Sequence, residues 1–174
     1  MQIGLFYGSS TCYSEMAAEK IQAQIDAHFR QSSVDIFNIK DEPLVGIQSY
    51  QHIILGIPTW DFGQIQEDWE TAWEELDLID FSNKQVALYG LGDQVGYPEW
   101  FLDAMGYLHD QVKAKGATIV GHWPITGYEF EDSKALTEDN KYFVGLALDE
   151  DNQFELSDER IKRWCDLVCE QFRE

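Results

Sequence analysis

The chain has 174 residues, of which 44% are hydrophobic, and a formal net charge of −20 at pH 7. This length predicts one domain, over residues 1–174, with enough apolar residues for a substantial core. The negative charge is dispersed along the chain, which argues against nucleic acid or an anionic membrane as a partner and favours basic protein surfaces.

Cysteine usage and the first residues indicate a compartment. The three cysteines, Cys12, Cys165 and Cys169, form an odd and sparse set that favours a reducing environment. The sequence enters an apolar run at Ile3 without the basic segment or cleavage signal of a secretory leader. No apolar run is long enough to span a bilayer. We therefore expect a soluble, cytoplasmic protein.

Strand and helix patterns alternate along the chain. Buried strands are expected over residues 3–7, 34–39, 52–56 and 85–90, the second being the most exposed. The helical patterns between them cover 15–30, 65–76 and a segment from Pro98 to Gly116. Ser157 is the expected N-cap of a last amphipathic helix.

A fifth strand begins at residues 117–121 and is expected to resume at 142–148. The acidic segment between them, residues 122–141, is called the insertion below. The alternation predicts an α/β fold, with a doubly wound five-stranded parallel sheet and helices on both faces. Ligands in such sheets bind beyond the carboxyl ends of the strands, where the three unusual loops of this chain lie.

The first of these loops, residues 8–14, is rich in hydroxyl groups at a turn from a strand into a helix. Backbone N–H groups at a helix N-terminus lack partners and, with the helix dipole, favour an anion such as phosphate. No Lys or Arg precedes Lys20, so neutral donors would hold that anion. The alternative is a turn that only caps the helix. The residues concerned are Ser9, Ser10, Thr11, Cys12, Tyr13 and Ser14.

Known phosphate motifs fit this chain poorly. The loop at 8–14 lacks the Gly-Lys-Ser/Thr ending of nucleotide-triphosphate loops. Ala18 stands six residues after Cys12, where a cysteine-phosphatase loop needs arginine. Residues 90–96 only weakly match a dinucleotide fingerprint, because the third glycine comes one residue late and the loop follows the fourth strand.

Two further loops carry large aromatic side chains. Residues 57–63 contain Trp60 and Phe62, and residues 91–97 end in Tyr97. Flat rings on neighbouring loops beside an anion site indicate a planar ligand held between Trp60 and Tyr97. The alternative is that both rings pack on the protein's own helices. Nearby glycines would let backbone amides approach the edge of the ligand: Gly56, Gly63, Gly90, Gly92 and Gly96.

Together, the motifs at 8–14, 58–63 and 90–97 resemble the flavodoxin family. The stretch 121–152, with its Gly-Tyr-Glu-Phe and Val-Gly-Leu-Ala-Leu-Asp segments, resembles the insertion of the long-chain class, and the chain is similar to the bacterial B subtype. The resemblance covers essentially the whole chain. It implies a flavodoxin-like fold with strand order 2-1-3-4-5, the fifth strand being interrupted by the insertion.

The resemblance also implies a non-covalent FMN and assigns residues to it. Ser9 to Ser14 would hold the phosphate, and Trp60 and Tyr97 would flank the ring. The backbone near Gly92 and Asp93 would meet the pyrimidine edge, and the Asp61–Phe62 peptide would face N5. The implied binding residues further include Pro58, Thr59, Gly63, Gly90 and Leu91.

The implied function is that of a carrier, not an enzyme. A flavodoxin would shuttle single electrons at low potential through the semiquinone/hydroquinone couple, as a monomer. Its donor would be a reductase of the flavodoxin/ferredoxin-NADP type, and its acceptors would be redox proteins with basic docking surfaces. The acids expected near the ring would disfavour an anionic flavin: Asp61, Glu67, Asp68, Asp93 and Glu99.

Two non-glycine residues depart from what the family pattern suggests. Many family members have glycine at the position of Cys12, so a left-handed backbone there would be strained. Asp61 likewise stands at a peptide thought to flip with redox state.

Two other functions remain open at this point. An FMN-dependent reductase of quinones or NAD(P)H would need an open substrate pocket over the flavin, which Trp60 and Tyr97 would close. A phospho-acceptor signalling domain of similar topology would need acids at the end of the first strand, where Tyr7, Gly8 and Ser9 stand. No metal site is expected, because the cysteines and histidines show no ligand spacing.

Overall fold

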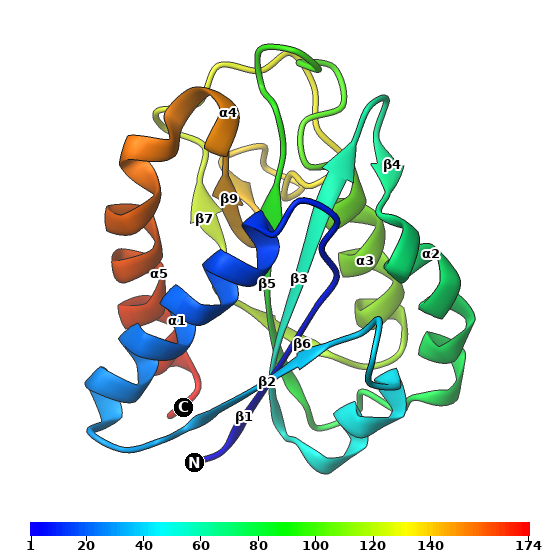
Figure 1. Cartoon of the computed structure of the whole chain (residues 1–174), viewed down its shortest axis with the longest axis vertical. Helices are drawn as coiled ribbons and strands as arrows, with labels where there is room; N and C mark the ends of the chain where they lie inside the picture. The colour runs from blue at the N-terminus through cyan, green and yellow to red at the C-terminus, as the bar shows by residue number, and fades with distance from the viewer.

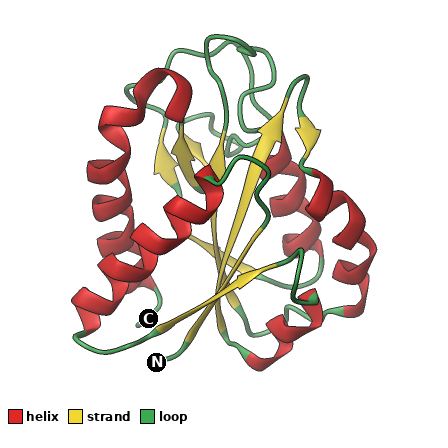
Figure 2. Cartoon of the chain, viewed as in Figure 1, coloured by secondary structure: helices red, strands yellow, loops and turns green.

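The computed structural model describes all 174 residues, as a parallel sheet with helices on both faces (Figures 1 and 2). The main strands run in the order β2-β1-β3-β5-β6, and β9 also pairs with β5. When the interrupted edge strand is counted once, this is the expected order 2-1-3-4-5. The strands are β1 (Ile3–Tyr7), β2 (Val34–Asn38), β3 (His52–Trp60), β5 (Gln85–Leu91), β6 (Thr118–Val120) and β9 (Leu146–Leu148).

Helices cover the two faces of the sheet in pairs. Figure 1 shows α1 (Tyr13–Phe29) beside α5 (Ser157–Gln171) on one face, and α2 (Glu67–Ala72) with α3 (Asp103–Ala114) on the other. None of the helices is both long and apolar enough to cross a membrane. The short helical elements are η1 (Leu44–Ser49), η2 (Trp73–Leu78), α4 (Glu150–Gln153) and η3 (Phe154–Leu156).

Burial follows the position of each strand in the sheet. All five residues of β1 are buried, because neighbouring strands and helices on both faces enclose this strand. The edge strand β2 is mostly half-buried, as its alternating sequence predicts. Because β1, β3 and β5 are parallel neighbours in the buried centre of the sheet, the loops that follow them lie at one edge, the upper edge in Figure 1.

The fifth strand is interrupted, as predicted. β6 pairs with residues 85–87 of β5, and β9 pairs in parallel with residues 89–91. The expectation of a continuous strand over 142–148 is wrong in its first part, because β8 (Tyr142–Phe143) pairs antiparallel with β7 (Trp123–Pro124). The chain rejoins the sheet through Gly145, where a Cβ would lie 2.2 Å from the Leu88 carbonyl oxygen. Only glycine permits that approach.

Two other boundaries differ from the sequence prediction near the upper edge. β3 does not stop at residue 56 but continues to Trp60, because Thr59 and Trp60 pair antiparallel with β4 (Gln64–Ile65). The expected helix start at Pro98 is also wrong. Helix α3 begins at Asp103, after Leu102 takes a left-handed backbone with φ 62°. The Thr59 hydroxyl accepts a hydrogen bond from the Ala104 amide at 3.0 Å, which fixes this late start against β3.

The helix expected over residues 65–76 is divided. The α-helix α2 ends at Ala72 and continues as the 3₁₀-helix η2. Of the four apolar residues that the helical spacing places on one face, Trp69 and Leu76 are fully enclosed, whereas Ile65 and Trp73 are half-buried against the core. The change from α to 3₁₀ geometry is common at the ends of short helices.

Candidate functional site

A pocket of about 300 Å³ opens at the carboxyl edge of the sheet. Three of its walls come from the loops that follow β1, β3 and β5, and the fourth from the start of α4. The lining residues are Thr11, Tyr13, Ser14, Pro58, Thr59, Trp60, Asp61, Leu91, Gly92, Asp93, Tyr97, Glu150 and Asp151. The structure thus brings together residues from all three loops that the sequence singled out.

Six of the expected binding residues lie outside this lining. They are Ser9, Ser10, Cys12, Phe62, Gly63 and Gly90. The first three belong to the turn between β1 and α1, directly beside the lining residues Thr11 and Tyr13. Phe62 is 64% exposed and packs edge-on against Tyr97, so it forms the outer rim of the pocket.

The hydroxyl groups of the first loop do not cap helix α1. The N-cap residue is Cys12, which makes no side-chain capping hydrogen bond. The Ser9 Oγ atom is buried and has no hydrogen-bond partner within the protein. A buried unpaired hydroxyl carries a desolvation cost that a ligand oxygen can remove. This arrangement favours the anion site over the helix-cap alternative.

Cys12 adopts the left-handed backbone that the family pattern suggested for its position. Its backbone is left-handed, with φ 67° and ψ −4°, so this loop does place a non-glycine residue in a strained region. Asp61 does the same on the opposite wall, with φ 44°. Both are exposed residues, and both lie in turns that form the pocket.

Gln66 supports the first loop from behind, and sequence reasoning missed it. Its side chain is 1% exposed and donates from Nε2 to the Ser10 hydroxyl at 3.1 Å. A Cβ on Gly8 would overlap Gln66 Oε1 and would lie 2.7 Å from the ring of the fully buried Trp69, so the loop passes these two side chains closely because residue 8 is glycine. Nothing in the sequence marks Gln66, because a glutamine before a helix is an ordinary surface residue.

Tyr89 fixes the first turn of α1 to the sheet. This buried residue of β5 donates its hydroxyl to the Ser14 carbonyl oxygen at 2.8 Å. Burial raises the pKa of Tyr89 well above its usual value, so the hydroxyl remains a donor. The contact joins the first loop to the strand that carries the third.

Trp60 and Tyr97 form the opposite end of the pocket. Both side chains are partly exposed along the lining, so neither is absorbed into the core. The Trp60 Nε1 atom is buried without a partner, and Tyr97 donates its hydroxyl to Asp61 at 3.2 Å. The hydrogen bond and the charge of Asp61 raise the pKa of Tyr97. The two rings and the first loop therefore line one pocket, the arrangement expected for a flat ligand with an anionic group.

Carboxylates line the pocket together with Trp60 and Tyr97, and no Lys, Arg or His does. The expected acids Asp61 and Asp93 are present, whereas Glu67, Asp68 and Glu99 do not line the pocket. Glu150 and Asp151 complete the set, and sequence reasoning missed their role. The signal that could have found them is the acidic run that directly follows β9, at the same edge of the sheet as the other loops.

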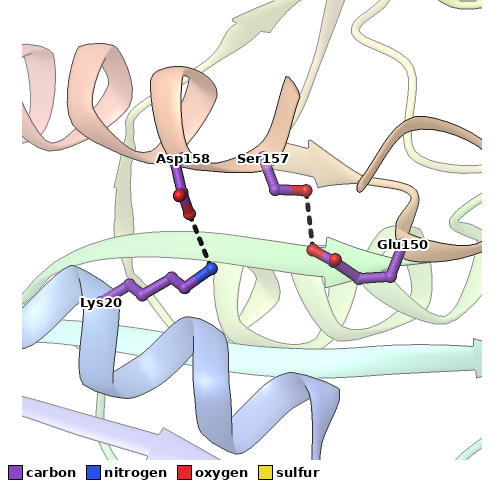
Figure 3. Close-up of polar contacts among 4 residues, drawn as sticks. All are labelled: Lys20, Glu150, Ser157 and Asp158. Atoms are coloured by element: carbon purple, nitrogen blue, oxygen red, sulfur yellow. Dashed lines mark hydrogen bonds and ion pairs between the residues drawn. The ribbon is translucent and has the colours of Figure 1, made fainter. Parts of the chain in front are cut away.

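Glu150 is held in place by α5. Ser157 donates its hydroxyl to Glu150 at 2.7 Å, and Lys20 of α1 pairs with Asp158 at 2.6 Å (Figure 3). Ser157 is therefore not the expected N-cap. It is the first residue of α5, and its hydroxyl orders a pocket residue instead.

The pKa values of two pocket carboxyls are shifted in opposite directions. Burial and the charges of Asp93 and Asp149 raise the pKa of Asp151. Burial also disfavours the charged form of Asp93, but hydrogen bonds from Gly96, Asn152 and Val95 outweigh it and lower the pKa. The pocket therefore combines one carboxyl whose pKa is lowered by its hydrogen bonds, Asp93, with one whose pKa is raised by burial and neighbouring charges, Asp151.

Comparisons with a family model and with individual proteins indicate the same family. A family model described as Flavodoxin matches residues 5–164. Flavodoxin 2 of Escherichia coli K12 is 55% identical over 174 residues, which covers 100% of this chain and 98% of that protein. A flavodoxin of Synechococcus elongatus is 43% identical and covers 98% of both chains.

A solved structure extends the comparison to three dimensions. The crystal structure of Fusobacterium nucleatum flavodoxin bound to flavin mononucleotide superposes with a TM-score of 0.90 and 32% sequence identity. The match covers 98% of both chains, so the insertion and all three pocket loops fall within essentially the same architecture.

Proposed function

This chain belongs to the flavodoxin family of electron-transfer proteins, and we propose that its pocket binds FMN through the three loops described above. We further propose that residues 1–174 act as a single FMN-binding domain. The observation that carries this assignment is the joining of a hydroxyl-rich turn, with its unpaired Ser9 Oγ, to Trp60 and Tyr97 in one pocket.

The proposal gives each wall of the pocket a role. Residues 9–14 bind the phosphate through hydroxyl and backbone N–H donors, and Trp60 and Tyr97 flank the ring. The backbone of residues 90–93 would meet the pyrimidine edge of the flavin. The Asp61–Phe62 peptide, at the tip of the turn between β3 and β4, would face its N5 atom. Pro58, Thr59 and Gly63 complete the wall beside it.

Bound FMN supplies the one-electron chemistry, and the protein adjusts its potential. The carboxylates at the ring end disfavour added negative charge on a neighbouring group, since no basic side chain lines the pocket to compensate them. Water exclusion by Trp60 and Tyr97 strengthens this effect. The combined result is a low potential for the second electron.

An electron carrier of this kind exchanges electrons with redox partner proteins. We propose a reductase of the flavodoxin/ferredoxin-NADP type as donor and acceptors with basic docking surfaces. The net charge of −20 and the acids around the pocket support such surfaces. We also propose that the protein works as a cytoplasmic monomer. The association rate with a basic partner should fall steeply as salt is raised, and an unchanged rate would contradict this part.

Reconstitution of the apoprotein with FMN tests the assignment. We expect a yellow protein with quenched Trp and flavin fluorescence, followed by accumulation of one-electron-reduced flavin during stepwise reduction. Direct two-electron reduction would contradict the carrier function. Rapid NAD(P)H oxidation with a quinone, without an added reductase, would instead support the reductase alternative that the sequence left open.

A further inference from the structure

A second pocket lies between α3 and β6, and it shares no lining residue with the pocket described above, called the first pocket here. Its volume is about 390 Å³, within the range that small ligands occupy. Three segments form its walls: the last turns of α3, residues 117–122, and residues 134–144, which lead into β9. The proposed function does not use this pocket, which is called the edge pocket below.

The edge pocket is the reverse of the first pocket in charge. Two lysines and two histidines line it, whereas no Lys, Arg or His lines the first pocket. The chain as a whole has 32 acids against 12 lysines and arginines, so this grouping departs from its general character. The basic residues concerned are His109, Lys113, His122 and Lys134.

The acids of the edge pocket match these charges only in part. Asp110 is hydrogen-bonded to His109 Nδ1 at 2.9 Å. Neither Lys113 nor Lys134 makes an ion pair, although Glu138 lines the same pocket. Two ammonium groups therefore remain available to an anion from solution, and a charge-assisted hydrogen bond is among the stronger contacts that they can make.

His122 experiences a positive local field. Burial lowers its pKa, and the positive charges of His109 and Lys113 lower it further, while the charge of Asp139 acts against them. An environment that disfavours added positive charge on His122 favours a negative ligand beside it. The other charged residues that line the pocket are Asp110, Lys134 and Glu138.

The edge pocket also has an apolar side. Its lining includes Ala117, Ile119, Leu136 and Val144, of which the first three are half-buried and Val144 is buried. The Val144 backbone N–H donates to the Ala135 carbonyl oxygen at 2.8 Å, which fixes this wall in place. Apolar side chains next to a few basic groups match a ligand that carries an anionic group on an apolar body.

We propose that the edge pocket is a second binding site, and that it takes a small organic carboxylate. Lys113, His122 and Lys134 bind the carboxylate, and the apolar side chains contact the rest of the ligand. Such a ligand uses both sides of the pocket, whereas an inorganic anion would use only the basic one. The site is independent of FMN, because the two pockets have no residue in common.

Benzoate is the probe for the test, because it joins a carboxylate to an apolar ring. Titration of the full-length protein at constant ionic strength, followed by NMR, should shift the backbone amide signals of residues 109–113, 117–122 and 134–144. Benzamide has the same shape without the charge, and acetate has the charge without the ring. Each should bind about tenfold more weakly than benzoate. Equal binding of either one would overturn the assigned ligand class.

Two double variants separate the edge pocket from the net charge of the protein. Lys113→Gln/Lys134→Gln should weaken benzoate binding about tenfold, as expected for lost charge-assisted hydrogen bonds. Lys40→Gln/Lys162→Gln makes the same change in net charge at two exposed lysines that lie outside the pocket and make no ion pair. This control should leave the affinity unchanged, and equal losses in the two double variants would overturn the site.

The His122 ring gives a second readout. Bound benzoate should favour the protonated imidazole, so the pKa of His122 should rise when benzoate is added. By linkage, benzoate should bind more weakly as the pH rises through that pKa. The variant His122→Gln identifies the NMR signal of this ring among the four histidines. A His122 pKa that benzoate leaves unchanged would overturn the proposal.

Addition of FMN separates this proposal from the proposed function. Benzoate should stay bound when FMN is added, because the two pockets share no lining residue. Displacement of benzoate by FMN would show that the probe occupies the first pocket, and would overturn the second site. If the native protein bound no FMN, the proposed function would fall, whereas the two double variants would still test the edge pocket by themselves.

Discussion

The two ends of the pocket are built from different chemistry. The phosphate end presents hydroxyl groups and backbone N–H groups, with Ser9 Oγ unpaired and Gln66 as a neutral support. The ring end presents aromatic faces and the carboxylates of Asp61, Asp93, Glu150 and Asp151. Neither end contributes a basic side chain. Under the proposed function, the first end would attach the cofactor and the second would adjust its potential.

The two ends nevertheless share one backbone feature. Cys12 and Asp61 both carry positive φ values in turns where glycine would be unstrained. Because the same strain occurs at both ends, its effect can be separated from that of side-chain chemistry. Substitutions at each end can therefore be compared.

The largest effect should follow from Gly8→Ala at the phosphate end. The new Cβ would overlap Gln66 Oε1 and lie 2.7 Å from the fully buried Trp69 ring, which cannot move aside, so the loop should be displaced. We expect FMN binding to weaken by about 3 kcal/mol, roughly a hundredfold. Gly46→Ala is the control, because its Cβ would meet only the Phe6 ring, at 3.6 Å. Titration of the apoproteins with FMN measures both, and similar affinities for the two variants would refute the role of the loop.

Trp60→Ala at the ring end should come second. Loss of one stacking face should weaken FMN binding by about 2 kcal/mol, in the range seen for other ring-stacking contacts. Phe62→Ala, which removes a 64% exposed ring from the rim, should weaken it far less. The same titration compares them. If Phe62→Ala weakened FMN binding more than Trp60→Ala, the flavin ring would lie at the rim and not against Trp60.

Much of this site could be predicted from the sequence because its signals are local. The hydroxyl run at 9–14, the aromatic residues Trp60 and Tyr97 and the interrupted fifth strand are each visible in a short segment. Their convergence follows from the topology of parallel sheets, where successive loops share one edge. The structure confirms the strand order. It also shows Trp60 and Tyr97 in one pocket with residues of the first loop, 8–14.

The parts that the sequence did not reveal depend on distant contacts. Gln66 reaches Ser10 across 56 positions, and Gln94 reaches Asp149 across 55. Helix α3 starts five residues later than expected, since Leu102 is left-handed and Thr59 binds the Ala104 amide. None of these partners is adjacent in the chain, so periodicity and propensity carry no signal of them.

A smaller effect should follow from relief of backbone strain. Cys12→Gly should stabilise the apoprotein by about 1 kcal/mol, because glycine adopts positive φ without a Cβ penalty. Arg30→Gly, at the other end of α1 with φ 56°, should give a similar gain. Only the first substitution touches the phosphate end, so only it should alter FMN affinity. Urea unfolding measures the gains, and a loss of stability in Cys12→Gly would show that the left-handed backbone is not the relevant strain.

The smallest effect should be a pH dependence that separates two carboxyls of the ring end. The lowered pKa of Asp93 means that its ionised form stabilises the fold above its ordinary value of 3.8, and that this contribution is lost as the pH falls through the lowered value. The raised pKa of Asp151 means that its ionised form destabilises the fold. The folded state prefers its protonated form, so stability is lost as the pH rises through the raised value.

Substitution of each carboxyl should therefore act in opposite directions at neutral pH. Asp93→Asn should lower the stability of the apoprotein at pH 7 and matter little at strongly acidic pH. Asp151→Asn should raise stability at pH 7 and remove the contribution that protonation of Asp151 makes to stability on acidification. Urea unfolding across the pH range checks both. The same sign of change for the two variants at pH 7 would refute the opposing environments.

The most direct test of the account compares FMN with riboflavin, which has the same ring but no phosphate. If hydroxyl and backbone donors at one end provide most of the attachment, the native apoprotein should bind riboflavin roughly a hundredfold more weakly than FMN. Both flavins should still be quenched once bound between Trp60 and Tyr97. Equal affinity for the two flavins would contradict the assignment of the phosphate end, and binding without quenching would contradict that of the ring end.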